Sequence, residues 1–166
     1  MDMIPANLGE IIIRYLRPED SDSYIALEMD AAAKRYLNGP SKKSEAELRG
    51  DIKRYIPSNH LLVIADAKTD NYLGRCGFLD AENPNEKELY LVLSTHSKRK
   101  GLGKIVVGFL VSCIFAEGFK PVAYVDPGNS ISIKFFRELG WINTGAIEKK
   151  NYQQGHLVYV FPKEKS

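Results

Sequence analysis

The sequence has few of the residues that metal sites and disulfide frameworks require. Its 166 residues include two cysteines and three histidines. Cys76 and Cys113 lack the spacing of a metal motif and are too few for a disulfide framework. His60, His96 and His156 show no mutual spacing typical of a metal site or a catalytic triad. The sequence therefore predicts no resident metal.

Long apolar runs and a strong charge of one sign are also missing. No stretch is both apolar and long enough to cross a bilayer, and no secretory signal is recognisable, which predicts a cytoplasmic protein without a membrane partner. The formal net charge is +2, and no strip of interleaved basic and aromatic residues is present. We therefore expect no nucleic-acid partner, and any electropositive site must be local.

The pattern of apolar residues predicts one domain over residues 1–166 that combines strands and helices. Strands are expected at residues 10–16, 61–65, 72–79, 88–93, 121–126, 141–148 and 157–161. Helices are expected at 19–37, from 44 onward to about 56, and at 101–117 and 130–139. The early strands favour antiparallel pairing, and the later alternation requires a parallel crossover. The fold class is thus α+β, a mixed sheet of about six to seven strands with helices on both faces.

A basic glycine turn separates the strand at 88–93 from the helix at 101–117. It consists of Lys98, Arg99, Lys100, Gly101, Leu102, Gly103 and Lys104. Bare backbone N–H groups and positive charge at a helix start favour a phosphate. A dinucleotide fingerprint would need glycine where Val106 stands, and a Walker loop would need a hydroxyl where Ile105 stands. Both nucleotide motifs are excluded, which leaves another phosphate ligand or a basic helix start without any ligand.

A second segment decides between these alternatives. The helix at 130–139 opens with Asn129, carries Ser132 in its first turn and ends before Leu139-Gly140-Trp141. Together the two segments resemble the GNAT superfamily of acetyl-CoA-dependent N-acetyltransferases. Residues 98–103 meet its motif Arg/Gln-x-x-Gly-x-Gly/Ala, with lysine in the first position. The later residues meet Asn-x-x-Ala/Ser followed by Leu-Gly-Phe, with tryptophan in the last position.

The resemblance extends over residues 10–161. The opening segment, residues 13–20, and the end of the first helix, residues 34–37, resemble the branch that contains the ribosomal-protein N-terminal acetyltransferases. This resemblance implies the GNAT fold, with a sheet splayed between the strands around 88–93 and 121–126.

The resemblance also implies acetyl-CoA as the cosubstrate. In the family, the glycine turn wraps the pyrophosphate of coenzyme A, and the pantetheine arm lies along the splayed strand. The cofactor-binding residues it implies are Leu91, Val92, Leu93, the turn Lys98 to Lys104, Asn129, Ser132 and Phe136. Some of the turn's cations can equally be solvated surface charges.

Two catalytic residues follow from the resemblance, each with a structural alternative. Glu88 aligns with a carboxylate that begins this strand in many relatives and would act as the base, or it is a surface glutamate. Ser132 would assist the departing thiolate, or its hydroxyl serves the first helical turn. Phe136 stands where many relatives carry a proton-donating tyrosine. A backbone N–H of Leu91 or Val92 would polarise the thioester carbonyl.

The resemblance predicts direct transfer of an acetyl group to a primary amine, either a protein N-terminus or a small molecule. Glu28 and Asp30 would attract such an amine, or they are solvated helix charges. An exposed edge strand near the C-terminus is compatible with a homodimer. Two alternatives remain: transfer from a longer acyl-CoA, and an acyl-CoA-binding regulatory domain without turnover, which the phenylalanine at position 136 motivates.

Overall fold

The computed structural model describes residues 3–97, 101–149 and 152–162. The strands in these ranges are β1 Ala6–Asn7, β2 Ile11–Tyr15, β3 Leu62–Asp66, β4 Tyr72–Asp80, β5 Glu86–Leu93, β6 Lys120–Val125, β7 Ile142–Glu148 and β8 His156–Val160. The α-helices there are α1 Ser21–Glu28, α2 Glu45–Ser58, α3 Leu102–Ala116 and α4 Ser130–Glu138. Short 3₁₀ turns, η1 Pro18–Asp20 and η2 Thr95–Ser97, precede α1 and follow β5.

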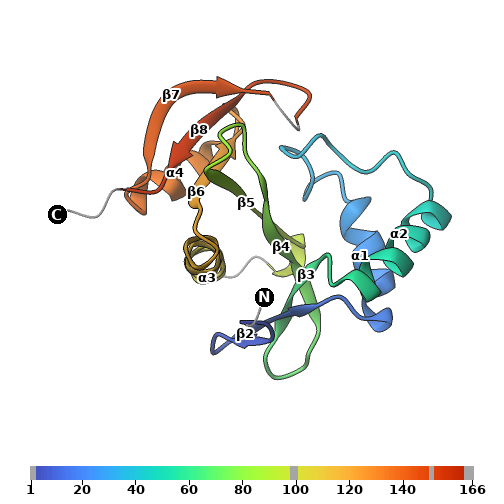
Figure 1. Cartoon of the computed structure of the whole chain (residues 1–166). Helices are drawn as coiled ribbons and strands as arrows, with labels where there is room; N and C mark the ends of the chain where they lie inside the picture. The colour runs from blue at the N-terminus through green and yellow to red at the C-terminus, as the bar shows by residue number, and fades with distance from the viewer. Residues whose placement is uncertain (1–2, 98–100, 150–151, 163–166) are drawn as a thin grey trace. The chain divides into compact units, whose positions relative to one another are not determined.

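The strands form an eight-stranded mixed sheet in the order β1-β2-β3-β4-β5-β6-β8-β7 (Figure 1). The pairs from β1 to β4 are antiparallel, and β5 pairs with β6 in parallel. The α+β prediction and its parallel crossover are confirmed. The sheet has one strand more than expected, because β1 is only two residues long and shows no periodicity in the sequence. None of the helices in the described ranges has the length and apolar character needed to cross a membrane.

The pairing between β5 and β6 is short. Its register joins Glu86 to Lys120, Lys87 to Pro121 and Glu88 to Val122. Both strands run on past the last of these pairs, β5 to Leu93 and β6 to Val125. The described pairs lie before Leu91, where the predicted splay would begin.

The chain divides into two compact units. The first unit comprises Met1–Arg35, Gly39–Gly77 and Leu91–Phe109, and the second comprises Tyr36–Asn38, Phe78–Tyr90 and Leu110–Ser166. Strands β4 and β5 and helix α3 each contribute residues to both units.

The core of the first unit lies between α1, α2 and the sheet. Its buried cluster consists of Leu16, Tyr24, Ile25, Leu48, Ile52, Leu61, Val63 and Ala65. Helix α2 begins with a capping box, in which Ser44 Oγ accepts from the Glu47 N–H and a Glu47 carboxylate oxygen accepts from the Ser44 N–H. This cap fixes where α2 starts and therefore which of its faces meets the core.

The prediction of a helix over residues 19–37 is wrong in its second half. Helix α1 ends at Glu28, and turns follow up to Asn38. Asp30 Oδ1 accepts hydrogen bonds from the N–H groups of Ala32 and Ala33, at 2.9 and 3.1 Å. A short acidic side chain that bonds its own following backbone competes with the helix, and here it produces a turn.

The second unit is built on β6, β7, β8 and α4, and part of its core is aromatic. Phe136 of α4 is buried against Trp141 and Tyr159, with ring centroids 5.0 and 6.1 Å away. Trp141 in turn meets Phe161 edge to face. These contacts hold α4 on the strands and so fix the position of its first turn.

Candidate active site

The structure places the predicted site residues in both units. In the first unit lie Leu91, Val92, Leu93, Gly101, Leu102, Gly103 and Lys104. In the second unit lie Glu88, Asn129, Ser132 and Phe136. The predictions for Lys98, Arg99 and Lys100 lie outside the described residues.

The first-unit part of the site is the start of α3. Gly101 has φ +88°, a conformation that favours glycine, and Leu102 behind it is fully buried. Helix α3 begins at Leu102 and runs for 15 residues. An α-helix leaves its first N–H groups without intrahelical acceptors and carries positive dipole charge there, to which the exposed Lys104 adds. A helix start of this kind favours an anionic group, and its role toward the pyrophosphate of coenzyme A stays a prediction.

Strand β5 approaches β4 very closely at Val92 and Leu93, which belong to the predicted pantetheine-binding segment. A Cβ atom on Gly74 of β4 would lie 2.1 Å from the Val92 carbonyl oxygen and 3.0 Å from the Leu93 Cα. The Ser94 N–H also donates to the Leu73 carbonyl, at 2.9 Å. The path of β5 through Val92 therefore requires glycine at position 74.

Gly74→Ala is expected to lower the free energy of unfolding by about 1–3 kcal/mol or more, because the new methyl group must displace the β5 backbone. Gly50→Ala is the matched control. Gly50 lies inside α2 with open space around its Cβ position, so alanine there should stabilise by up to about 1 kcal/mol. Urea denaturation of both variants tests this, and equal stabilities would contradict the close approach.

The second-unit part includes the first turn of α4. Asn129 caps the helix, since its side-chain oxygen accepts from the Ser132 N–H at 3.1 Å. This cap fixes Ser132 in the first turn. Phe136, one turn further, belongs to the aromatic core. The proposed roles of these residues toward coenzyme A stay predictions.

Glu88 is a buried carboxylate in the second unit, with only 1% of its surface exposed. The surface alternative for Glu88 is therefore wrong. The Tyr152 hydroxyl donates a short hydrogen bond to Glu88 Oε1. Tyr152 lies in the turn segment between β7 and β8, outside the motifs of the sequence.

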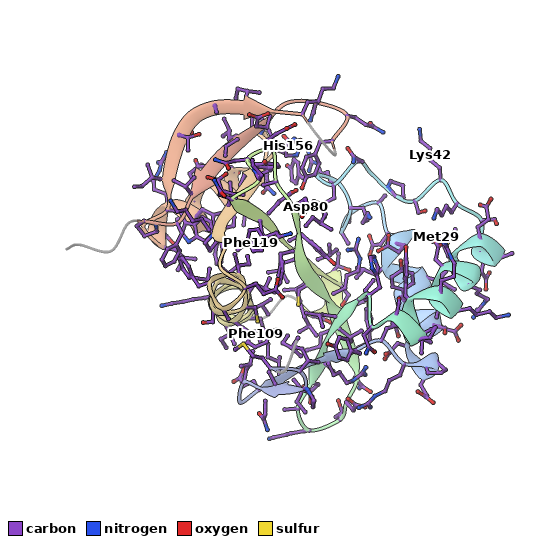
Figure 2. All side chains as sticks on the ribbon, viewed as in Figure 1. Met29, Lys42, Asp80, Phe109, Phe119 and His156 are labelled. Carbon is purple, nitrogen blue, oxygen red and sulfur yellow. The ribbon has the colours of Figure 1, made fainter. Side chains whose placement is uncertain are left out.

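Two further aromatic rings contact the ring of Tyr152. His156, at the start of β8 (Figure 2), stacks on the Tyr152 ring with centroids 3.8 Å apart. Tyr124 of β6 meets Tyr152 edge to face at 6.5 Å, and its hydroxyl accepts from the Glu82 N–H at 3.0 Å. Burial, more than any charge, raises the pKa of Tyr124. The hydroxyl that bonds the Glu88 carboxylate therefore belongs to a cluster of aromatic rings.

Glu28, one of the two candidate acceptor residues, is buried and already paired. Its carboxylate accepts from Arg75 Nε at 2.6 Å and from Lys34 Nζ at 3.1 Å. The expectation of a solvated helix charge is wrong for Glu28. Because two cations balance it, Glu28 offers no uncompensated negative charge to an acceptor amine.

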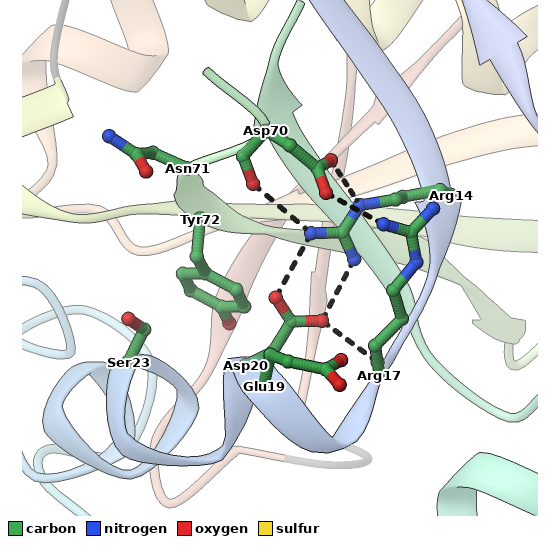
Figure 3. Close-up of a pocket in the computed structure, with 8 residues that line it drawn as sticks. All are labelled: Arg14, Arg17, Glu19, Asp20, Ser23, Asp70, Asn71 and Tyr72. Carbon is green, nitrogen blue, oxygen red and sulfur yellow. Dashed lines mark hydrogen bonds and ion pairs between the residues drawn. The ribbon is translucent and has the colours of Figure 1, made fainter.

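A separate pocket of about 300 Å³ lies in the first unit beside β2 and the β3–β4 turn (Figure 3). Arg14 lines this pocket. Its guanidinium donates hydrogen bonds to the Asp20 carboxylate at 2.8 and 3.0 Å and to Asp70 Oδ1 at 2.8 Å. Arg17 pairs with the same Asp70. The hydrogen bonds that Arg14 donates to Asp20 raise the pKa of Arg14, against the opposing effect of burial. These pairs tie β2 to its neighbours and identify the pocket wall as structural.

The sequence matches the acetyltransferase (GNAT) domain family over residues 10–142. The match spans most of the chain, so the chain belongs to the GNAT acetyltransferase family. A comparison with curated proteins gives no match.

Solved structures of this fold resemble the chain over nearly its whole length. A GNAT-family acetyltransferase from Bacillus anthracis superposes with a TM-score of 0.76 at 15% identity, covering 95% of this chain and 97% of the other. Spermidine N-acetyltransferase from Vibrio cholerae, in complex with CoA and spermine, gives 0.75 at 16% identity, covering 92% and 95%. Ard1 from Thermoplasma volcanium gives 0.64 at 17% identity, covering 93% and 100%. At these identities the likeness concerns the fold.

Proposed function

We propose that the chain is a single-domain N-acetyltransferase that moves an acetyl group from acetyl-CoA to a primary amine by direct attack. The observation that carries this proposal is the Glu88 carboxylate, buried on β5 in a chain of the GNAT family. A carboxylate in such a place is a candidate general base. The acceptor is a small amine or a protein N-terminus, as in the ribosomal-protein branch that the sequence resembles.

The residues described above have distinct tasks in this reaction. The start of α3 would hold the pyrophosphate, the backbone of Leu91 to Leu93 would hold the pantetheine arm, and Asn129 would contact the same arm. When bound, acetyl-CoA supplies an activated acetyl thioester. An acceptor amine with a pKa of about 8–10 is mostly protonated at neutral pH, and Glu88 accepts its proton directly or through one water.

The thioester carbonyl and the departing thiolate of coenzyme A depend less on side chains than the acceptor amine does. A backbone N–H of Leu91 or Val92 would donate to the thioester oxygen. Phe136 cannot protonate the departing sulfur, but a thiol with a pKa of about 8.5 leaves as a thiolate without a dedicated acid. Ser132, in the first turn of α4, is the nearest candidate in sequence for assisting it.

Coenzyme A is expected to raise the melting temperature. Ligand at 100 times its Kd stabilises the folded state by about 2.7 kcal/mol, which corresponds to roughly 5–10 °C for a chain of this size. Free-thiol release from acetyl-CoA, with a polyamine and with a peptide amine, then tests transfer; the N-acetylated peptide is the control. No thermal shift would contradict the whole proposal.

The same assay separates the two alternatives. A thermal shift without thiol release from any amine would favour a regulatory domain that binds acyl-CoA. Faster release from a longer acyl-CoA than from acetyl-CoA would favour a different acyl donor.

A further inference from the structure

Tyr152 is held firmly within the second unit. Its ring lies between His156, stacked at 3.8 Å, and the edge of Tyr124. The residues that follow are anchored as well, because the Gln153 N–H donates to Asn38 Oδ1 at 2.8 Å and Gln154 Nε2 donates to Asp126 Oδ2 at 2.6 Å. These contacts direct the Tyr152 hydroxyl at Glu88 Oε1.

The Tyr152 phenol remains protonated, and therefore a hydrogen-bond donor, over a wide pH range. Burial, and then the negative charge of Glu88, raise the pKa of Tyr152. The phenol therefore stays protonated throughout the pH range in which an acetyltransferase works. A neutral O–H that donates to a carboxylate favours the ionised form of that carboxylate.

Several charged groups are described near this pair and on the same strand. Glu82 and Glu148 are negative and act on the neighbouring Tyr124, and Lys87, the cation next to Glu88 on β5, pairs with Asp80. Like charges and burial both disfavour an ionised carboxylate. The hydrogen bond from Tyr152 opposes both. Among the described residues, Glu88, Tyr124 and His156 are the titratable groups that contact Tyr152, while Glu82 and Glu148 act on Tyr124.

We propose that Tyr152 is a positioning residue for Glu88: its phenol fixes the orientation of the Glu88 carboxylate and keeps it ionised, ready to accept a proton. The inference rests on the proposed function, in which Glu88 is the base. Tyr152 acts through Glu88. The turn between β7 and β8, which no sequence motif of the chain includes, would thus contribute to the active site.

Tyr152→Phe tests this role, because it removes the hydroxyl and keeps the ring against His156 and Tyr124. Carbon-13 NMR of labelled glutamate side chains follows the titration of Glu88, whose signal is assigned by its loss in Glu88→Gln. The midpoint is expected to rise by about one pH unit, as for a hydrogen bond lost from a charged group. The acidic limb of kcat/KM should move by the same amount, with the thermal shift caused by coenzyme A unchanged.

Tyr124→Phe is the matched control, since it removes a neighbouring phenol that bonds the Glu82 backbone. It should leave the Glu88 midpoint where it is. The inference would be overturned if the titration midpoint of Glu88 were the same in Tyr152→Phe and in wild type. It would also be overturned if that midpoint moved while the acidic limb of the kcat/KM profile stayed in place. A wild-type protein that releases no thiol with any amine would contradict the proposed function, while the titration of Glu88 still decides whether Tyr152 controls it.

Discussion

Glu88→Gln is expected to lower kcat/KM for acetyl transfer about 100-fold near pH 7, the effect typical of losing a general base. Glutamine cannot accept the proton that the acceptor amine must lose. Above the pKa of the amine, about 8–10, the acceptor is already neutral, and the difference from wild type should shrink. Free-thiol release measured across this pH range gives the two profiles.

Glu86→Gln is the control for this variant. Glu86 lies two residues earlier on β5, on the same face of the strand, and is half-buried. It should change kcat/KM little at any pH. Glutamine at position 88 keeps an oxygen that can accept from Tyr152, so the melting temperature should stay close to that of wild type. Parallel pH profiles for Glu88→Gln and wild type would rule out Glu88 as the base.

Much of the fold could be predicted because local patterns agree with it. The capping box at Ser44 and Glu47 and the Asn129 cap each lie within four residues, so the sequence contains all the partners that they need. The strands from Leu62 onward alternate or run apolar over five residues or more, which is enough to show their period. Local signals of this kind also located the start of α3.

The structure adds partners that no local pattern contains. Tyr152 and Glu88 are 64 residues apart, and Tyr152 lies in a polar turn without periodicity. Glu28 looked like a solvated helix charge, and only the fold brings Arg75, 47 residues later, to its carboxylate. Burial of a charged residue depends on such distant partners, which is why the alternatives for Glu88 and Glu28 stayed open in the sequence.

Asp20→Asn is expected to lower the free energy of unfolding by about 3–5 kcal/mol, the cost typical of removing one partner of a buried ion pair. Arg14 is 4% exposed and Asp20 is 5% exposed, and two hydrogen bonds join them. Asp20 also accepts from the Arg17 N–H at 2.8 Å, which fixes the start of η1. An amide at this place turns donor hydrogens toward the guanidinium of Arg14.

Asp22→Asn provides the comparison, because the Asp22 side chain is 89% exposed and pairs with Arg49 at the surface. A surface pair of this kind contributes about 0–1 kcal/mol. Arg14→Met combined with Asp20→Asn should recover part of the loss, since removing the buried cation removes the need for its partner. Urea denaturation of the three variants measures these differences. A loss below about 1 kcal/mol in Asp20→Asn would mean that Asp70, which also bonds Arg14, is sufficient to balance its charge.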